Sequence, residues 1–132
     1  MDSLVIVDAA NVVGSVPDGW WRDRRGAAER LRDALADRAA TGLPGLVEPP
    51  LELVLVVEGA ARGVASVPGV RAVSAQGSGD DAIVALVADE GADRDCLVVT
   101  ADRGLRERVQ ALGARVTGPR AVRGETGRRG AS

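Results

Sequence analysis

Short, unbroken runs of branched aliphatic residues constrain the fold of this chain more than any other feature. The clearest runs are LVIV at 4–7, LVLVV at 53–57 and CLVV at 96–99. Continuous apolar runs of this length are typical of strands that are covered on both faces, as in a parallel sheet. The chain has no Phe and no Tyr, so its core must be built from Val, Leu, Ala and Ile, which suits such strands.

Strand-like and helix-like segments alternate along the chain. The predicted strands span 4–7, 51–57, 69–73, 96–100 and 114–117, and the predicted helices span 21–40, 80–90 and 103–112. A loop is expected at 10–19, where Gly14, Pro17 and Gly19 interrupt any regular pattern. This order predicts the α/β class, as a three-layer α/β/α sandwich around a mostly parallel, about five-stranded sheet.

The length of 132 residues suits a single hydrophobic core. We expect the domain to span 1–120 and residues 121–132 to form a flexible tail rich in Arg and Gly. The N-terminus does not resemble a signal peptide, and no segment reaches membrane-spanning length. We therefore expect a cytoplasmic protein without membrane contact.

All 17 basic residues are arginine, and the chain contains neither lysine nor histidine. This composition excludes a Schiff-base lysine, a histidine base and a Walker-type phosphate lysine, and it argues against a receiver domain, which also needs a lysine. Cys96 lies inside an apolar run and is expected to be buried, so we expect no disulfide and no cysteine zinc site. Any catalysis must depend on carboxylates, hydroxyls, arginines and metal ions.

Acidic residues stand where the apolar runs end or a helix begins. Asp8 follows the first run, Glu58 the second and Asp102 the third, while Asp80 and Asp81 open a predicted helix. The carboxyl ends of parallel strands share one edge of a sheet, so these acids are expected to meet there. Clustered carboxylates repel one another unless a cation lies among them, and oxygen ligands favour Mg²⁺ or Mn²⁺. All five acids are therefore candidate metal ligands.

Each acid also has a simpler interpretation. Asp8 can close a turn, Asp102 can cap a helix, and the chain can merely turn after Glu58. One of Asp80 and Asp81 is expected to be the N-cap of its helix, which leaves the other, preferably Asp80, to point into the crevice.

Two uncharged polar residues lie beside these acids in the sequence. The amide of Asn11 can orient a water or touch a phosphate, and the hydroxyl of Thr100 can hold a carboxylate or a metal-bound water. Arg103 and Arg62 are candidates for phosphate contacts, although a surface charge is the simpler interpretation of Arg62. Residues 1–114 carry 12 arginines and 18 acids, whereas residues 115–132 carry 5 arginines and 1 acid. A polyanion could therefore bind this acidic body only if metal ions offset its charge and arginines at its rim or in the tail attract the backbone.

Two further motifs have alternative interpretations. The segment GSGDDA at 77–82 matches a dinucleotide-binding pattern, but two aspartates at the helix start would face the pyrophosphate, so we reject this reading. Trp20 and Trp21, beside three arginines, can form a stacking platform for single-stranded nucleic acid. We favour the alternative in which they cover the core under a loop.

Three segments resemble the NYN branch of the PIN-like nucleases: VDAANVV at 7–13, GSGDDAIV at 77–84 and VVTADRGLRERVQALGARV at 98–116. The resemblance spans residues 4–118 and implies a PIN-like domain that hydrolyses RNA with bound metal. It further implies that Asp8, Asp80 or Asp81, and Asp102 bind the metal, with Asn11 and Thr100 in support. In this branch a Gly-aromatic pair usually occupies the positions of Ala9 and Ala10, and Asp often occupies that of Glu58.

Our leading hypothesis is a metal-dependent endoribonuclease that hydrolyses phosphodiester bonds of single-stranded or structured RNA by Mg²⁺ or Mn²⁺ activation of water. Such a small acidic domain is expected to gain specificity from a homodimer or a protein partner. The second hypothesis is a catalytically weak or inactive RNA- or protein-binding module, which Glu58 and the acidic body favour. The third is a metal-dependent nucleotide phosphohydrolase, which would need a closed pocket.

Overall fold

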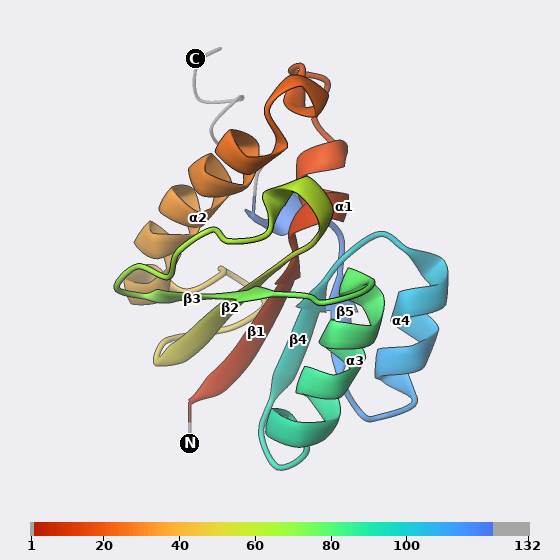
Figure 1. Ribbon diagram of the computed structural model, residues 1–132. Helices are drawn as coiled ribbons and strands as arrows, with labels where there is room; N and C mark the ends of the chain where they lie inside the picture. The colour runs from red at the N-terminus through yellow and green to blue at the C-terminus, as the bar shows by residue number, and fades with distance from the viewer. Residues whose placement is uncertain (1, 123–132) are drawn as a thin grey trace.

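Five parallel strands form the centre of the molecule, in the order β3-β2-β1-β4-β5 (Figure 1). The computed structural model describes residues 2–122. The strands are β1 (Ser3–Asp8), β2 (Leu51–Val57), β3 (Val70–Ser74), β4 (Cys96–Val99) and β5 (Arg115–Thr117). All four neighbouring pairs are parallel, so the predicted α/β sheet is confirmed.

Helices cover both faces of this sheet, which gives the three predicted layers (Figure 1). Successive side chains of a strand point to opposite faces, so Val5 and Val7 join one core and Leu4 and Ile6 the other. The first core lies under α1 (Ala9–Gly14) and α2 (Arg24–Thr41), and the second under α3 (Gly79–Glu90) and α4 (Arg103–Gln110). The covering on both faces explains why the strands read as continuous apolar runs.

Residues 9–14 form the short helix α1, so the prediction of a loop over 10–19 was wrong at its start. Asp8 caps the helix by accepting a hydrogen bond from the backbone amide of Asn11, and Ala9 and Val12 are buried beneath it. Asn and Val are weak helix formers and Gly14 follows at once, which hid this helix in the sequence. Its position directly after β1 fixes the direction of the chain beyond Asp8.

The ends of two longer helices differ from their predicted positions. The helix predicted from residue 21 begins at Arg24, because Asp23 is its N-cap, and Trp20–Arg22 form a separate 3₁₀ turn, η1. A second 3₁₀ turn, η2 (Gly59–Ala61), follows β2. The helix predicted to reach residue 112 ends at Gln110, and Leu112, expected on its apolar side, is 46% exposed.

The remaining structural predictions concern the tail and the single cysteine. Ala121 and Val122, at the start of the predicted tail, still pack against the first core, and residues 123–132 lie outside the described part of the chain. Cys96 is buried as expected, and burial raises the pKa of its thiol to about 11. Among residues 2–122, no helix has the length and apolar character of a membrane span.

Candidate functional site

The carboxyl ends of β1 and β4 meet at the middle of the sheet. Val7 of β1 pairs with Val99 of β4, so Asp8 and Thr100 are the next residues on neighbouring strands. Both are buried, Asp8 with 5% of its surface exposed and Thr100 with none. The strand order reverses between β1 and β4, and ligands of open α/β sheets bind in the crevice at such a point.

Hydrogen bonds hold the Asp8 carboxylate in one orientation. Its Oδ2 accepts from the Thr100 hydroxyl at 2.9 Å, and its Oδ1 accepts from the backbone amide of Asn11 at 3.3 Å. Thr100 Oγ1 in turn accepts from the Asp102 backbone amide at 3.1 Å. The Asn11 side chain accepts from the Ala101 amide at 2.8 Å, which ties α1 to the loop after β4. Asn11 and Thr100 therefore both position the groups around Asp8.

Asp80 lies in the first turn of α3, and it is not the N-cap. Ser78 caps this helix by accepting from the Asp81 amide at 3.2 Å, so the prediction that one of the two aspartates is the cap was wrong. The S-x-x-D spacing of Ser78 and Asp81 is the capping signal that could have indicated this. Because Ser78 caps the helix, the Asp80 carboxylate is not needed for capping. The Asp80 side chain is partly buried.

Asp81 is exposed and pairs with an arginine. Its carboxylate lies 3.0 Å from Arg108 of α4, and 75% of the side chain is exposed. An exposed pair of this kind contributes little to stability. The two neighbouring aspartates thus have different surroundings, and Asp80 is the one that faces other acids.

Glu58 connects the end of β2 to the start of α3. Its Oε1 accepts from the Gly79 backbone amide at 2.8 Å. A Cβ at position 79 would lie 2.2 Å from this oxygen, so only glycine allows the approach without displacing Glu58. The carboxylate uses one oxygen to satisfy a free amide at the helix N-terminus, a role that the sequence did not reveal.

Asp102 caps α4, as one of its two interpretations predicted. Its Oδ1 accepts from the Leu105 amide at 2.9 Å, and the residue is exposed. Capping uses one oxygen, so the other remains available to a ligand. Arg103, next to it, is exposed, whereas Arg62 reaches the Gln76 carbonyl oxygen at 3.5 Å.

The acids at this edge of the sheet lie close enough to raise one another's pKa. Burial raises the pKa of Asp8, and the charges of Asp80 and Glu58 raise it further, whereas the bonds from Thr100 and Asn11 oppose the rise. Burial also raises the pKa of Asp80, followed by the charges of Asp102 and Glu58, whereas the charge of Arg108 opposes the rise. None of the ion pairs found in residues 2–122 involves any of these four acids. We call Asp8, Glu58, Asp80 and Asp102 the acidic edge.

The donor set of the acidic edge fits a hard divalent cation. Carboxylates that repel one another without a paired arginine are stabilised when a cation lies among them, and oxygen-only ligands suit Mg²⁺ or Mn²⁺. Within the described chain, however, no three acidic side chains lie close enough together to hold an ion. Glu58 and Asp102 each accept a hydrogen bond from a helix amide through one carboxylate oxygen. Binding would therefore require side-chain rotation.

The raised pKa of Asp8 predicts that Asp8→Asn stabilises the metal-free protein at neutral pH. The folded state keeps the Asp8 proton to a higher pH than the unfolded chain, whose pKa is 3.8. The stability that Asp8 contributes is thus complete below the unfolded pKa and is lost as pH rises through the folded pKa. Asparagine does not titrate, and its carbonyl oxygen can keep the cap bond from the Asn11 backbone amide. Its NH₂ group cannot accept from the Thr100 hydroxyl as the carboxylate does, but it can donate to that hydroxyl instead.

Urea unfolding in EDTA checks this expectation. At pH 7 we expect Asp8→Asn to be more stable than wild type by about 1 kcal/mol. The difference should shrink towards pH 4, where the wild-type carboxyl also becomes neutral. A variant that is less stable than wild type at pH 7 would show that Asp8 is not under electrostatic stress.

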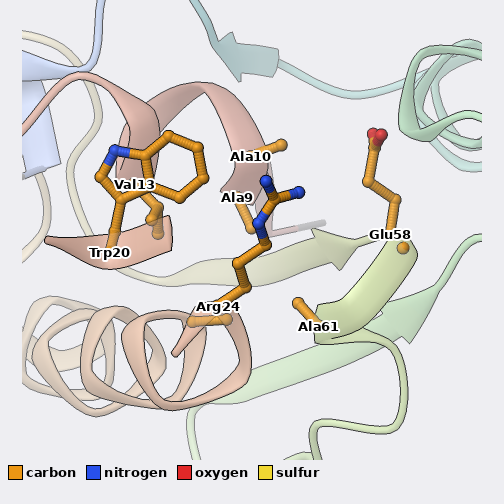
Figure 2. A pocket seen from close by; sticks show the side chains of 9 residues that line it. Ala9, Ala10, Val13, Trp20, Arg24, Glu58 and Ala61 are labelled. Carbon is orange, nitrogen blue, oxygen red and sulfur yellow. The ribbon is translucent and has the colours of Figure 1, made fainter. Parts of the chain in front are cut away.

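An apolar hollow lies beside the acidic edge, between α1, α2 and the end of β2 (Figure 2). Trp20 forms one wall, and the Arg24 guanidinium lies 5.2 Å from its ring centroid. Glu58 lines the opposite end. Trp21 is 53% exposed, so the interpretation as a core-covering residue was wrong for Trp21, whereas Trp20 is half-buried.

The comparisons with known proteins indicate the fold. No family model matches the sequence, and no curated protein matches it. A solved structure shares the fold. It is the crystal structure of a mutant of Rae1 (YacP) from Bacillus subtilis, with a TM-score of 0.69 and 19% sequence identity. The match covers 97% of this chain and 76% of that chain. The whole described sheet and its helices therefore form an arrangement that Rae1 also has.

Proposed function

We propose that this protein is a metal-dependent endoribonuclease whose reaction centre is the acidic edge. The observation that carries the proposal is the buried Asp8 carboxylate, which Thr100 and Asn11 hold in place among acids that raise its pKa. Perturbed carboxylates at the crevice of an α/β sheet are candidates for function. The resemblance of three segments to NYN nucleases and the fold shared with Rae1 support the proposal.

The residues of the acidic edge would hold Mg²⁺ or Mn²⁺. A bound ion supplies a water of lowered pKa and offsets charge that develops on the phosphate. Asp8 is held in one orientation by its two hydrogen bonds, while Asp80 keeps both carboxylate oxygens free of hydrogen bonds within residues 2–122. Asn11 keeps the loop of Ala101 against α1, so that Asp102 stays next to Thr100.

Cleavage assays with pure protein test the proposal. Single-stranded and hairpin RNA should be cleaved internally with Mn²⁺ or Mg²⁺, and EDTA should abolish the reaction. Free nucleotides should not be hydrolysed, since the crevice is an open sheet edge. Absence of EDTA-sensitive RNA cleavage at every metal concentration would refute the nuclease, and hydrolysis of nucleotides alone would favour a phosphohydrolase.

Metal binding has a readout that is independent of cleavage. At about 100 times its Kd, Mn²⁺ should stabilise the folded state by about 2.7 kcal/mol, because it binds acids that come together only in that state. Thermal unfolding with and without Mn²⁺ measures this effect. No change in Tm at millimolar Mn²⁺ would argue against the acidic edge as a metal site.

A second candidate is a module of the same fold that binds RNA without cleaving it. The observation that favours it is the separation of the acids, of which Glu58 and Asp102 are each bonded to a helix amide. RNA binding without cleavage, together with no Mn²⁺ effect on Tm, would identify this second function. We propose RNA as the partner in both cases, and a homodimer or protein partner as the source of further specificity.

A further inference from the structure

The hollow beside the acidic edge has walls suited to a flat, uncharged group (Figure 2). Its volume of about 140 Å³ is roughly ten times the volume that one water molecule requires. Its lining is mostly apolar, with Ala9, Ala10, Val13 and Ala61 among the contributing residues. Such a surface does not suit a phosphate, which needs several polar donors.

Trp20 and Arg24 form a platform on one side of the hollow, and we call this pair the stacking platform. The guanidinium lies over the indole ring, 5.2 Å from its centroid. Within residues 2–122, Arg24 forms neither an ion pair nor a side-chain hydrogen bond, and it is exposed. Its planar cation is therefore available to a ligand. Unpaired nucleobases stack on aromatic rings and on arginine guanidinium planes.

The stacking platform lies close to the acidic edge. Ala9 and Ala10 line the hollow and follow Asp8 directly in the chain, and Glu58 belongs to both regions. Figure 2 shows the Arg24 guanidinium between Trp20 and Glu58, with the Glu58 carboxylate at the far end. A nucleotide with its phosphate at the acidic edge would thus have the hollow within reach of a neighbouring base.

We propose that the hollow is a base subsite, in which one unpaired nucleobase of the RNA stacks on Trp20 and Arg24 while an adjacent phosphodiester lies at the acidic edge. The inference rests on the proposed nuclease function and adds to it a preference for single-stranded RNA. A base held in a duplex cannot enter the hollow without leaving its stack. Stacking is tolerant of sequence because every base has a flat face, so the subsite selects strandedness.

Trp20→Leu and its matched control Trp21→Leu test the subsite. Both remove an indole from η1, but only Trp20 lines the hollow. Binding of a labelled single-stranded RNA hexamer is measured by anisotropy with Mn²⁺, with the acidic edge intact and with phosphorothioate linkages that resist hydrolysis, so that the RNA stays intact. Trp20→Leu should weaken binding by about 5- to 100-fold, and Trp21→Leu by less than about 2-fold. Arg24→Gln, compared with Arg22→Gln, repeats the test without an aromatic change.

Hexamers with a single abasic position separate stacking from a general structural effect. One abasic position should weaken binding by the protein with Trp20 in place and have no further effect in the Trp20→Leu variant. Equal binding by the Trp20 and Trp21 variants would overturn the subsite. A Trp20→Leu variant that stays as sensitive to that abasic position as the protein with Trp20 would overturn it as well. Wild-type cleavage with equal binding by the two variants would sink the subsite alone. Selective base binding without any wild-type cleavage would sink the nuclease alone.

Discussion

Asp8→Asn should reduce the rate of RNA cleavage by at least about 100-fold, since loss of residues that only support a metal site already costs about 10- to 100-fold. The substitution keeps the size of the side chain and removes the charge at the most buried position of the acidic edge. The increase in Tm with Mn²⁺ should disappear as well. Steady-state cleavage and thermal unfolding measure the two effects.

Asp81→Asn is the matched control for this experiment. It makes the same chemical change, but Asp81 is exposed and pairs with Arg108 of α4. Its cleavage rate should stay within about 2-fold of wild type, because an exposed ion pair contributes only about 0–1 kcal/mol. If the two variants lose activity equally, the loss reflects overall negative charge and the central role of Asp8 is wrong.

Asp8→Asn is also expected to make the metal-free fold more stable at neutral pH. The two expectations together distinguish a functional carboxylate from a structural one. A structural aspartate loses stability when its charge is removed, whereas one retained for catalysis gains it. Because Asp8→Asn is expected to lower the cleavage rate and to raise the stability, damage to the fold could not explain the lost cleavage.

Thr100→Val should lower the free energy of unfolding by about 2–3 kcal/mol. The hydroxyl is fully buried, donates to Asp8 and accepts from the Asp102 amide. Valine has nearly the same shape but leaves the carboxylate without its best donor and the amide without its acceptor. Loss of a bond to a charged group costs about 1.5–3 kcal/mol. Urea unfolding at pH 7 measures this loss.

The same variant should also move the pH dependence of cleavage. The Thr100 hydrogen bond lowers the pKa of Asp8, so its removal raises that pKa further. Cleavage that needs ionised Asp8 would then begin at a higher pH. Thr100→Ser keeps the hydroxyl and should retain the wild-type profile, with a smaller loss of stability. An unchanged acidic limb in Thr100→Val would refute the positioning role of Thr100.

The sequence predicted the sheet well because its strands carry a strong local signal. Each strand from β1 to β5 lies within about two residues of its expected position. The signal is strongest in β1, β2 and β4, whose buried residues form nearly unbroken apolar runs. The helix ends were predicted less accurately. Single side chains such as Asp23 and Ser78 determine them, and several neighbouring residues could have served as caps.

The site was predicted in its residues more than in its contacts. Parallel strand ends lie at one edge, which brings Asp8, Glu58 and Thr100 towards each other whatever the loops do. The bond from Gly79 to Glu58 depends on the path of the loop before α3, for which the sequence has no periodic signal. The hollow likewise depends on how η1 folds back against α1, so the sequence did not indicate Arg24 as its partner.

The reversal of strand order at β1 means that the two halves of the chain contribute equally to the site. Residues up to β3 supply Asp8 and Glu58, while the residues from α3 onwards supply Asp80, Thr100 and Asp102. The connection between them, residues 76–78, is exposed. Two separately expressed fragments divided there would each lack half of the carboxylates, so any activity would report that the fragments had reassociated.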